Sequence, residues 1–275
     1  MILREIYARC IVSKSKVFNY AINPYIGCQH SCTYCYARFM KRFTGHKEPW
    51  GEFIDVKINA PDLIFPSDAK KYRKKYITIG SVTDPYHEIE RKYELTRKIL
   101  QKLIPIQPII DIITKSDLVL RDIDLLKQFD DAIVLISLSM MDENLRKQLE
   151  PNAPSMQRRI SALKELHKAG IKTSLFISPI FPEITEWKEM IDLTKDFVTE
   201  YWIENLNFYP SIQQDIYAFL RKNKPELVKK YEEIFSKGSK YWDNLTQEIK
   251  EYCKKSKVRA SIAFHHGKKT KIIEV

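Results

Sequence analysis

The chain has 275 residues, and its 46 lysines and arginines against 35 aspartates and glutamates give a net charge of +11. No apolar run approaches the roughly 20 residues of a transmembrane helix, and charged residues follow Met1 before any apolar signal segment forms. The odd number of cysteines, five, is not typical of a disulfide framework. We therefore expect a cytoplasmic protein with no membrane partner.

The elements expected along the chain begin with strands. Short apolar stretches, often β-branched and bounded by polar or proline-containing turns, alternate with helical patterns. Such stretches suit strands that are buried on both faces of a parallel sheet. The expected strands are 17–23, 76–80, 109–113, 133–137 and 173–177, with a weaker sixth at 201–208.

Helical patterns lie between these strands. Residues 88–103 follow a turn and carry apolar residues near helical spacing, and 155–169 opens on Ser155, an N-cap candidate, and ends before Gly170. Alternation of strands and helices produces βαβ units and a parallel sheet. Six such units predict an α/β fold, a partial (β/α)6 TIM-like barrel.

The domain organisation follows from length and pattern. A chain of this size commonly forms one large domain, and we see no internal repeat or low-complexity linker. We expect a single domain over residues 1–275, with its core at about 13–210. The remainder, about 211–275, is expected to be a basic extension of helices that ends in one strand near 258–262.

Three cysteines, Cys28, Cys32 and Cys35, follow the first expected strand with Cys-x3-Cys-x2-Cys spacing. This spacing is that of a loop that supplies three thiolates to one metal cluster. An electron-transfer [4Fe-4S] cluster normally has four cysteine ligands, so three leave one iron open to a ligand that is not protein. Two alternatives are a zinc site with His30 as fourth ligand and three unrelated buried thiols.

The cysteines follow the first expected strand, and polar residues recur after the second, third and fourth. Parallel α/β sheets place their chemistry at the C-terminal ends of the strands, where capping side chains also occur. The segments concerned are Gly80–Tyr86, Thr114–Asp117, Ser137–Ser139 and Glu150–Ser155, the last followed by Arg159.

The cysteine spacing resembles the signature of the radical S-adenosylmethionine (radical SAM) enzymes. The resemblance implies the radical SAM type of barrel and two cofactors, a [4Fe-4S] cluster and S-adenosylmethionine (SAM) bound at the open iron. It also implies a flavodoxin- or ferredoxin-type electron donor and reductive cleavage of SAM to a 5′-deoxyadenosyl radical, which abstracts hydrogen from a substrate. The cofactor carries the hard step, and the protein binds and orients it.

Longer phrases resemble the spore photoproduct lyase-like branch, whose members are often labelled DNA repair photolyases. Tyr34 and Tyr36 flank the third cysteine, as tyrosines do in the lyase, where the second takes part in a hydrogen-atom relay. The relay's cysteine corresponds to Ser81 here, and an alcohol is a far poorer hydrogen-atom donor than a thiol. We therefore expect catalytic roles for Tyr36 and Ser81 but a reaction other than clean dimer reversal. The phrases are 23–28, 34–38, 83–86, 114–116 and 150–155.

SAM needs a cation for its carboxylate, hydroxyls or a carboxylate for its ammonium, and polar or aromatic partners for its nucleoside. We expect Lys115 and Arg159 near the carboxylate and Thr83 and Asp84 near the ammonium. The full set of expected SAM-binding residues is Tyr34, Tyr36, Thr83, Asp84, Lys115, Ser139 and Arg159.

Positive charge is concentrated at the end of the chain, where residues 221–275 hold 15 basic and 7 acidic residues, a net of +8. Such a segment is either a polyanion-binding face or a solvated helical surface. Two hypotheses follow. One is a radical SAM enzyme with DNA or RNA as a candidate substrate, and the other is a nucleic-acid-binding protein with a structural iron-sulfur or zinc centre.

Overall fold

The computed structural model describes residues 1–15, 19–264 and 271–275. Its main feature is a nine-stranded sheet in the order β12-β11-β10-β9-β8-β7-β6-β3-β2. All neighbours from β3 to β11 pair in parallel, and β2 and β12 are antiparallel edges. The strands are β2 (Val12–Lys14), β3 (Tyr20–Ile22), β6 (Tyr76–Ile79), β7 (Ile109–Thr114), β8 (Ala132–Leu138), β9 (Lys172–Ile180), β10 (Glu200–Asn205), β11 (Ala260–Phe264) and β12 (Lys271–Glu274).

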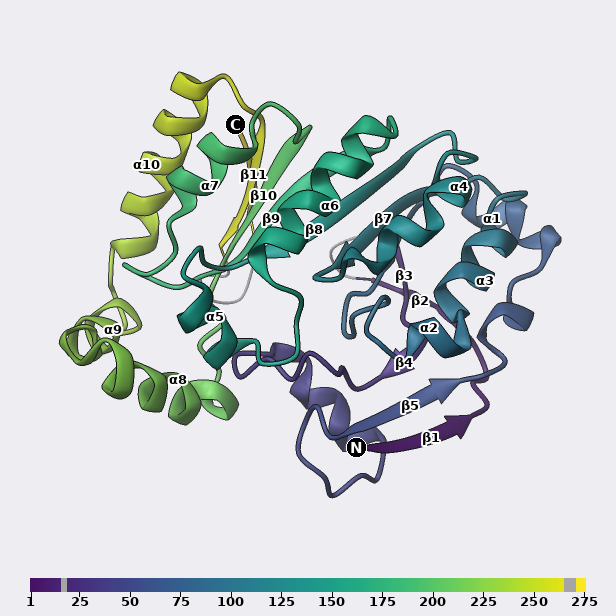
Figure 1. Cartoon of the computed structure of the whole chain (residues 1–275), viewed down its shortest axis with the longest axis horizontal. Helices are drawn as coiled ribbons and strands as arrows, with labels where there is room; N and C mark the ends of the chain where they lie inside the picture. Colours follow the sequence, from purple (N-terminus) through teal and green to yellow (C-terminus); the bar gives the residue numbers. More distant parts are fainter. Residues whose placement is uncertain (16–18, 265–270) are drawn as a thin grey trace.

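Helices cover one face of this sheet (Figure 1). The covering helices are α3 (Leu95–Leu103), α4 (Ile123–Leu126), α6 (Met156–Lys168), α7 (Trp187–Thr194) and α10 (Tyr241–Ser256). The other helices are α1 (Ala69–Tyr72), α2 (Glu90–Tyr93), α5 (Glu143–Leu149), α8 (Pro210–Asn223) and α9 (Val228–Ile234), with 3-10 turns at Tyr36–Phe43, Ala60–Leu63, Pro66–Asp68, Asp117–Asp122 and Pro225–Leu227. In the described part of the chain, no helix combines the length and apolar character needed to span a bilayer.

Side chains alternate between the two faces of each strand, because successive residues of a strand point to opposite sides. On β7, Ile110 and Ile112 are fully buried in the core between sheet and helices. Asp111 and Ile113 therefore point to the other face, where Ile113 lines a cavity. The burial of both faces confirms the expected type of strand, and the parallel α/β arrangement confirms the expected fold class.

Four expected strands are confirmed at β6 to β9. The first, expected at 17–23, appears as Tyr20–Ile22, and its residues 17 and 18 lie outside the described residues. The sixth is shorter than expected and ends at Asn205. The single strand expected near 258–262 is β11, which extends the parallel sheet, and β12 pairs with it in antiparallel register.

The continuous helix expected at 88–103 is wrong. The chain breaks at Glu94, whose φ of +52° is left-handed, so α2 and α3 are separate helices. The buried Glu90 carboxylate accepts from the backbone amides of Thr96 at 3.1 Å and Arg97 at 3.3 Å. These amides belong to the first turn of α3, where an acceptor from outside the helix is needed, and the break brings that acceptor into place.

A second, three-stranded sheet was not expected from the sequence. It has the order β1-β5-β4 and consists of β1 (Ile2–Ile6), β4 (Tyr25–Ile26) and β5 (Phe53–Lys57). β4 lies directly before the cysteine loop, so this sheet anchors the start of that loop. Figure 1 shows β1 and β5 at the end of the molecule opposite the C-terminus.

Candidate active site

The cysteine loop leaves β4 through Gly27, whose φ of +96° favours glycine. A Cβ atom there would lie 2.3 Å from the backbone oxygen of Phe53, so a side chain would clash with β5. The Thr83 hydroxyl donates a hydrogen bond of 2.5 Å to the backbone oxygen of Gly27. The loop is thus held against β5 on one side and against the segment after β6 on the other.

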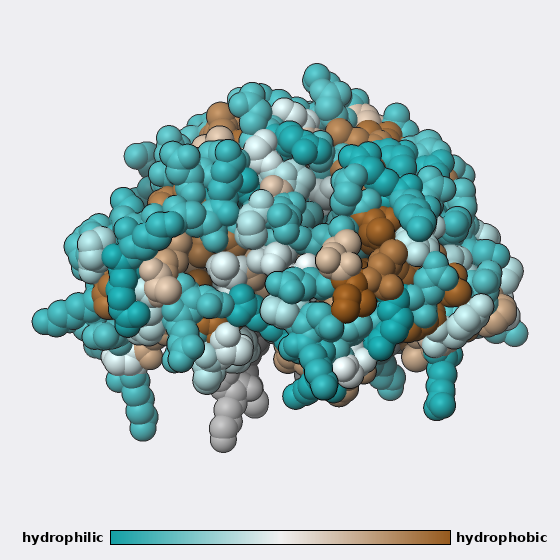
Figure 2. Space-filling view, turned by 60° about the horizontal axis from the view of Figure 1, so that its bottom comes forward, coloured by the Kyte–Doolittle hydropathy of each residue, from teal (hydrophilic) through white to brown (hydrophobic). Residues whose placement is uncertain are grey.

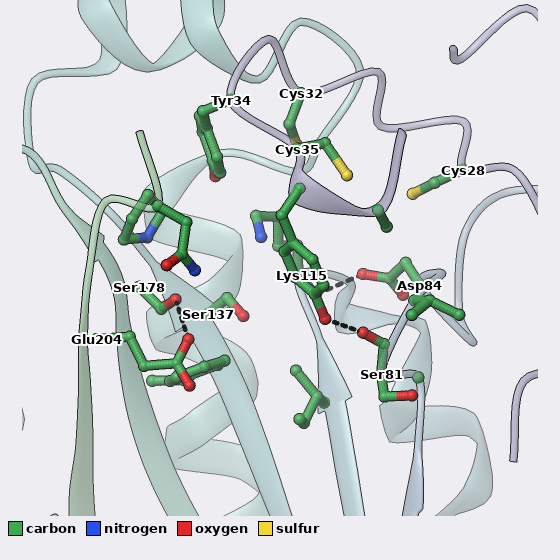
Figure 3. A pocket seen from close by; sticks show the side chains of 18 of the residues that line it. Cys28, Cys32, Tyr34, Cys35, Ser81, Asp84, Lys115, Ser137, Ser178 and Glu204 are labelled. Carbon is green, nitrogen blue, oxygen red and sulfur yellow. Dashed lines mark hydrogen bonds between the residues drawn. The ribbon is translucent and has the colours of Figure 1, made fainter. Parts of the chain in front are cut away.

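Cys28, Cys32 and Cys35 all line one cavity of about 360 Å³ at the C-terminal ends of the parallel strands. Figure 3 shows the three cysteines at one end of this cavity and Ser178 and Glu204 at the other, with Lys115 between them. The site expected at the C-terminal ends of the strands is therefore an enclosed cavity.

The three thiols suit an iron-sulfur cluster as a donor set. None is in a disulfide, and soft thiolate ligands favour such clusters. Burial raises the pKa of Cys28 well above its usual range, that of Cys32 to about 12, and that of Cys35. Binding of a metal cluster must therefore displace their protons.

The zinc alternative required His30 as a fourth ligand. The ring of His30 instead lies between two other partners, with Nε2 at 3.0 Å from the Asp84 carboxylate and Nδ1 at 3.4 Å from the backbone oxygen of Asn152. Across residues 1–15, 19–264 and 271–275, no three His, Cys, Asp or Glu side chains are placed to hold a single metal ion. The geometry does not favour the zinc site.

Asp84 lines the cavity, but its carboxylate is already committed to the protein. It accepts from the Thr114 hydroxyl at 2.6 Å, the Lys115 amide at 2.7 Å and the Tyr86 amide at 2.9 Å. Burial alone would raise the pKa of Asp84, but His30 and these donors hold it well below its usual range. Asp84 thus joins the segments after β6 and β7 and fixes the backbone at Lys115.

Lys115 is a partly buried cation whose ammonium lies 5.7 Å from the centre of the Tyr34 ring. Burial by itself would lower the pKa of Lys115, but its electrostatic interactions with Cys32 and Glu150 outweigh burial, and the pKa is raised. Lys115 therefore stays charged and lines the cavity beside the cysteines. This position agrees with the expected role of a cation for the SAM carboxylate.

Arg159 and Ser139, both expected to bind SAM, are not among the residues that line the cavity. Arg159 forms a fully buried ion pair with Glu150 and donates to the backbone oxygens of Ser137 at 3.0 Å and Pro154 at 2.9 Å. Burial would raise the pKa of Glu150, but Arg159 and Lys115 lower it to about 2. The guanidinium is therefore occupied within the fold.

The Glu150 carboxylate contacts three of the residues that were expected to bind SAM. Besides Arg159, it accepts hydrogen bonds from the hydroxyls of Tyr34 and of Ser139, the latter at 2.9 Å. Tyr34 also lines the cavity, so its ring faces the site while its hydroxyl is anchored. Glu150 lay in a phrase of the sequence that resembled the family but was not expected as a site residue.

Tyr36 and Ser81, the two expected catalytic residues, lie together on the cavity wall. The Tyr36 hydroxyl donates to the backbone oxygen of Ser81, and Asn23 Nδ2 donates to Ser81 Oγ at 3.0 Å. Because Asn23 supplies a donor to Ser81 Oγ, the Ser81 hydroxyl proton is left to point away from Asn23.

The wall opposite the cysteines contains Glu204, which sequence reasoning missed. Glu204 lies on β10 and faces the cavity with Ser178 of β9 (Figure 3). Burial raises the pKa of Glu204 to about 7. A charged residue within an otherwise buried strand, Tyr201–Asn205, was the available signal in the sequence.

Glu204→Gln is expected to stabilise the fold at high pH. Because the pKa of Glu204 is raised in the folded protein, this side chain does not destabilise the fold below its unfolded pKa of about 4.5. Above that pH the destabilisation by the ionised carboxylate grows, until the pH has risen through about 7. The glutamine should therefore add about 2–3 kcal/mol to the free energy of unfolding at about pH 8 and little at about pH 4. Urea unfolding at both pH values measures this, with Glu200→Gln on the same strand as control. An equal gain at both pH values would contradict it.

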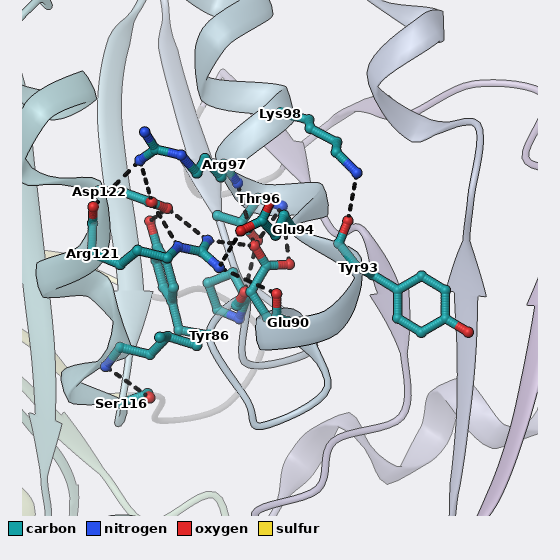
Figure 4. Close-up of polar contacts among 12 residues, drawn as sticks. Tyr86, Glu90, Tyr93, Glu94, Thr96, Arg97, Lys98, Ser116, Arg121 and Asp122 are labelled. Carbon is teal, nitrogen blue, oxygen red and sulfur yellow. Dashed lines mark hydrogen bonds and ion pairs between the residues drawn. The ribbon is translucent and has the colours of Figure 1, made fainter.

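Two buried carboxylates paired with partly exposed arginines support the segment after β6 (Figure 4). Arg121 pairs with Glu90 at 2.7 Å and with Asp122 at 2.8 Å, and the Tyr86 hydroxyl donates to Asp122 at 3.1 Å. Arg97 pairs with the same Asp122 at 2.8 Å. The network holds the base of the Thr83–Tyr86 segment, which in turn carries Asp84.

One part of the basic end of the chain, residues 254–259, lies away from this cavity. Residues 254–259 end α10 and directly precede β11, which runs parallel to β10. They therefore lie at the N-terminal edge of the sheet, whereas the cysteines lie at the C-terminal edge. Figure 1 shows the corresponding end of α10 far from the cysteine loop.

Known proteins share this sequence over most of its length. The radical SAM superfamily model matches residues 22–194. An uncharacterized protein of Methanocaldococcus jannaschii is 42% identical over 84% of this chain and 86% of its own length. The radical SAM Nalpha-GlyT isomerase of Pseudomonas phage M6 is 27% identical over 58% of this chain and 33% of its own length.

The solved structures add a likeness in fold. Spore photoproduct lyase complexed with dinucleoside spore photoproduct superposes with a TM-score of 0.70 at 17% identity, over 96% of this chain and 82% of its own. The expected likeness to that lyase is confirmed at the level of the fold. Because the family model covers more than half of the chain, this protein belongs to the radical SAM superfamily, whose enzymes use a [4Fe-4S] cluster and SAM and require an external reductant.

Proposed function

We propose that Cys28, Cys32 and Cys35 hold the [4Fe-4S] cluster and that SAM binds beside it in the cavity, with the substrate on the opposite wall. The observation that carries this proposal is that three free thiols and the partly buried cation Lys115 line the same cavity at the C-terminal ends of the strands. When bound, the cluster and SAM supply a 5′-deoxyadenosyl radical that abstracts hydrogen from the substrate. The alternative of a purely structural centre is not favoured by the family.

The roles that we assign to the protein's own residues are binding and positioning. Lys115 supplies the positive charge for the SAM carboxylate, and Asp84 fixes the backbone that carries Lys115. Tyr34 offers its ring to the cavity because Glu150 anchors its hydroxyl. Thr83 holds the cysteine loop through Gly27, so its effect on SAM is indirect.

Anaerobic reconstitution with iron and sulfide, followed by addition of SAM and dithionite, tests the proposed function. Formation of 5′-deoxyadenosine, measured by liquid chromatography, is the expected result. A protein that takes up a full cluster and forms no 5′-deoxyadenosine would support the structural-centre alternative instead.

Lys115→Ala is expected to weaken SAM binding by roughly 1.5–3 kcal/mol, because a hydrogen bond to a charged group is lost. The cluster should remain, since Lys115 ligates no iron. Isothermal titration of SAM into the reconstituted variant measures the change, and Lys172→Ala, an exposed lysine paired with Asp131 at 2.8 Å, is the control. Unchanged SAM affinity in Lys115→Ala would remove this residue from the site.

We further propose that the substrate is a base of a nucleic acid. The proposal is supported by one similar structure, spore photoproduct lyase, which was solved with a dinucleoside. It is also supported by the turn Tyr36–Phe43, which begins at the cavity and exposes aromatic rings next to cations. Phe43 is 64% exposed, and the Arg42 guanidinium lies 4.6 Å from the centre of its ring.

This exposed turn is a better candidate than the basic C-terminal segment for contact with a strand that enters the cavity. Aromatic rings and cations together suit single-stranded nucleic acid, because rings stack on bases and cations contact phosphates. Tyr209, 53% exposed, lines the same cavity. Figure 2, which brings the lower end of Figure 1 forward, shows apolar side chains gathered in patches on a mostly hydrophilic surface.

The double variant Lys41→Glu/Arg42→Glu is expected to weaken binding of single-stranded DNA and to reduce the salt dependence of that binding. Each lost phosphate contact should lower the slope of log K against log salt by about 0.7. Lys254→Glu/Lys255→Glu, which makes the same change of charge at the opposite edge of the sheet, is the matched control. Anisotropy titrations over a range of salt concentrations measure both, and a larger effect of the control pair would assign the contact to the C-terminal segment.

For Ser81 and Tyr36 we propose contact with the substrate rather than a thiol relay. Ser81 offers a hydroxyl, and an alcohol returns a hydrogen atom far less readily than a thiol. Cys253, the other buried cysteine, is fully buried in the core between the sheet and α10 and does not line the cavity. A radical reaction other than thiol-assisted dimer reversal is therefore the one that the site supports.

A further inference from the structure

The cavity wall opposite the cysteines is built by two neighbouring strands. Phe176 of β9 and Trp202 of β10 are partners in register, and Ser178 and Glu204 lie two residues further along the same strands. Residues two apart on a strand share a face, and all four line the cavity. The wall therefore has an aromatic part and, nearer the C-terminal ends of the strands, a polar part.

The Glu204 carboxylate has neutral partners. It accepts from Ser178 Oγ and from Trp202 Nε1, each at 3.3 Å, which are long hydrogen bonds. Within the described ranges, no lysine, arginine or histidine lies within ion-pair distance of it, although Lys115 is near enough to favour its charged form. Glu204 is partly accessible, and that accessible surface faces the cavity.

A carboxylate in such surroundings lowers the stability of the folded protein. An acid removed from water without a cation or strong donors destabilises the folded protein, and an apolar or amide side chain of similar size would not. Groups of this kind are concentrated at functional sites, where a ligand supplies the missing partner. When it is ionised, the Glu204 carboxylate can accept a further hydrogen bond from whatever occupies the cavity.

The residues around Glu204 indicate the chemical class of that hydrogen-bond donor. Two aromatic side chains next to Glu204 suit a flat ring, which can stack or meet them edge to face. The positive charge of Lys115 in the same cavity disfavours a cationic ligand. A neutral ring N–H meets both conditions, and a carbonyl on the same ring would suit the Ser81 hydroxyl on the facing wall (Figure 3).

We propose that the β9–β10 wall is the substrate subsite, in which Glu204 accepts a hydrogen bond from a ring N–H of a nucleobase that lies against Trp202 and Phe176. This inference rests on the proposed function, since it names the part of the substrate that the same cavity selects. Bases with a ring N–H beside a carbonyl, namely thymine, uracil and guanine, are favoured. Adenine and neutral cytosine lack that group.

The test uses the cluster-loaded protein with SAM bound and two labelled single-stranded oligonucleotides. One is oligo(dT), and the other has the same length with a methyl group on N3 of every thymine, which removes the ring N–H and keeps the charge. Wild type is expected to bind oligo(dT) about tenfold or more tightly than the methylated strand in fluorescence anisotropy. Glu204→Leu should lose this preference, and Glu200→Leu, a carboxylate earlier on the same strand, should keep it.

Several results would overturn the inference. These are no binding of either strand, equal binding of both strands by wild type, or a preference that persists in Glu204→Leu. A fall in SAM affinity of Glu204→Leu as large as its fall in affinity for oligo(dT) would assign the wall to SAM. Formation of 5′-deoxyadenosine by wild type is measured separately, so loss of this inference is distinguishable from loss of the proposed function.

Discussion

Replacing Cys28, Cys32 or Cys35 with alanine is expected to abolish both cluster assembly and the formation of 5′-deoxyadenosine. Wild type should hold about four irons per chain. Each variant has two thiolates left for a cluster that needs three protein ligands, and the described part of the cavity offers no close substitute, because the imidazole of His30 is held by Asp84. Iron content and 5′-deoxyadenosine are measured after identical anaerobic reconstitution.

The control for these variants is Cys10→Ala. Cys10 is exposed and does not line the cavity, so the variant should keep its cluster and its activity. Continued 5′-deoxyadenosine formation in any of the three cavity variants would show that the ligand assignment is wrong. One zinc ion per chain in anaerobically purified wild type would count equally against it.

The second large effect is expected from Arg159→Ala, which should lower the free energy of unfolding by about 3–5 kcal/mol. The variant leaves the Glu150 carboxylate buried without its ion-pair partner, and the backbone oxygens of Ser137 and Pro154 lose their donors. Because Arg159 and Lys115 together lower the pKa of Glu150 to about 2, this stabilisation is present above about pH 4.5 and is lost as the pH falls through about 2.

Urea unfolding at neutral pH measures this loss. Arg158→Ala is the matched control, since the neighbouring Arg158 side chain is 54% exposed and pairs with Asp117 at 2.7 Å. An exposed pair of this kind contributes roughly 0–1 kcal/mol. If Arg159→Ala is fully stable but binds SAM more weakly, the result would support the direct contact between Arg159 and SAM that the sequence predicted.

The sequence by itself predicted the parallel α/β fold, because the central strands are short apolar stretches bounded by turns and alternate with helical patterns. It predicted α6 from Ser155 and Gly170, which appear as the N-cap and as the glycine of positive φ after the helix. It also indicated the family, because cluster chemistry depends on ligands that are close in sequence, and the cysteine spacing is therefore visible without a structure.

Tertiary structure alone decided which polar residues face the cavity. Lys115 and Arg159 are both cations that follow the expected strands. A sequence cannot show that the Arg159 guanidinium pairs with Glu150 whereas the Lys115 ammonium lies beside the cysteines. It likewise decided the importance of Glu204, whose neighbours Phe176 and Ser178 come from another strand. Burial and pairing depend on contacts between residues distant in sequence, so they are set only when the sheet assembles.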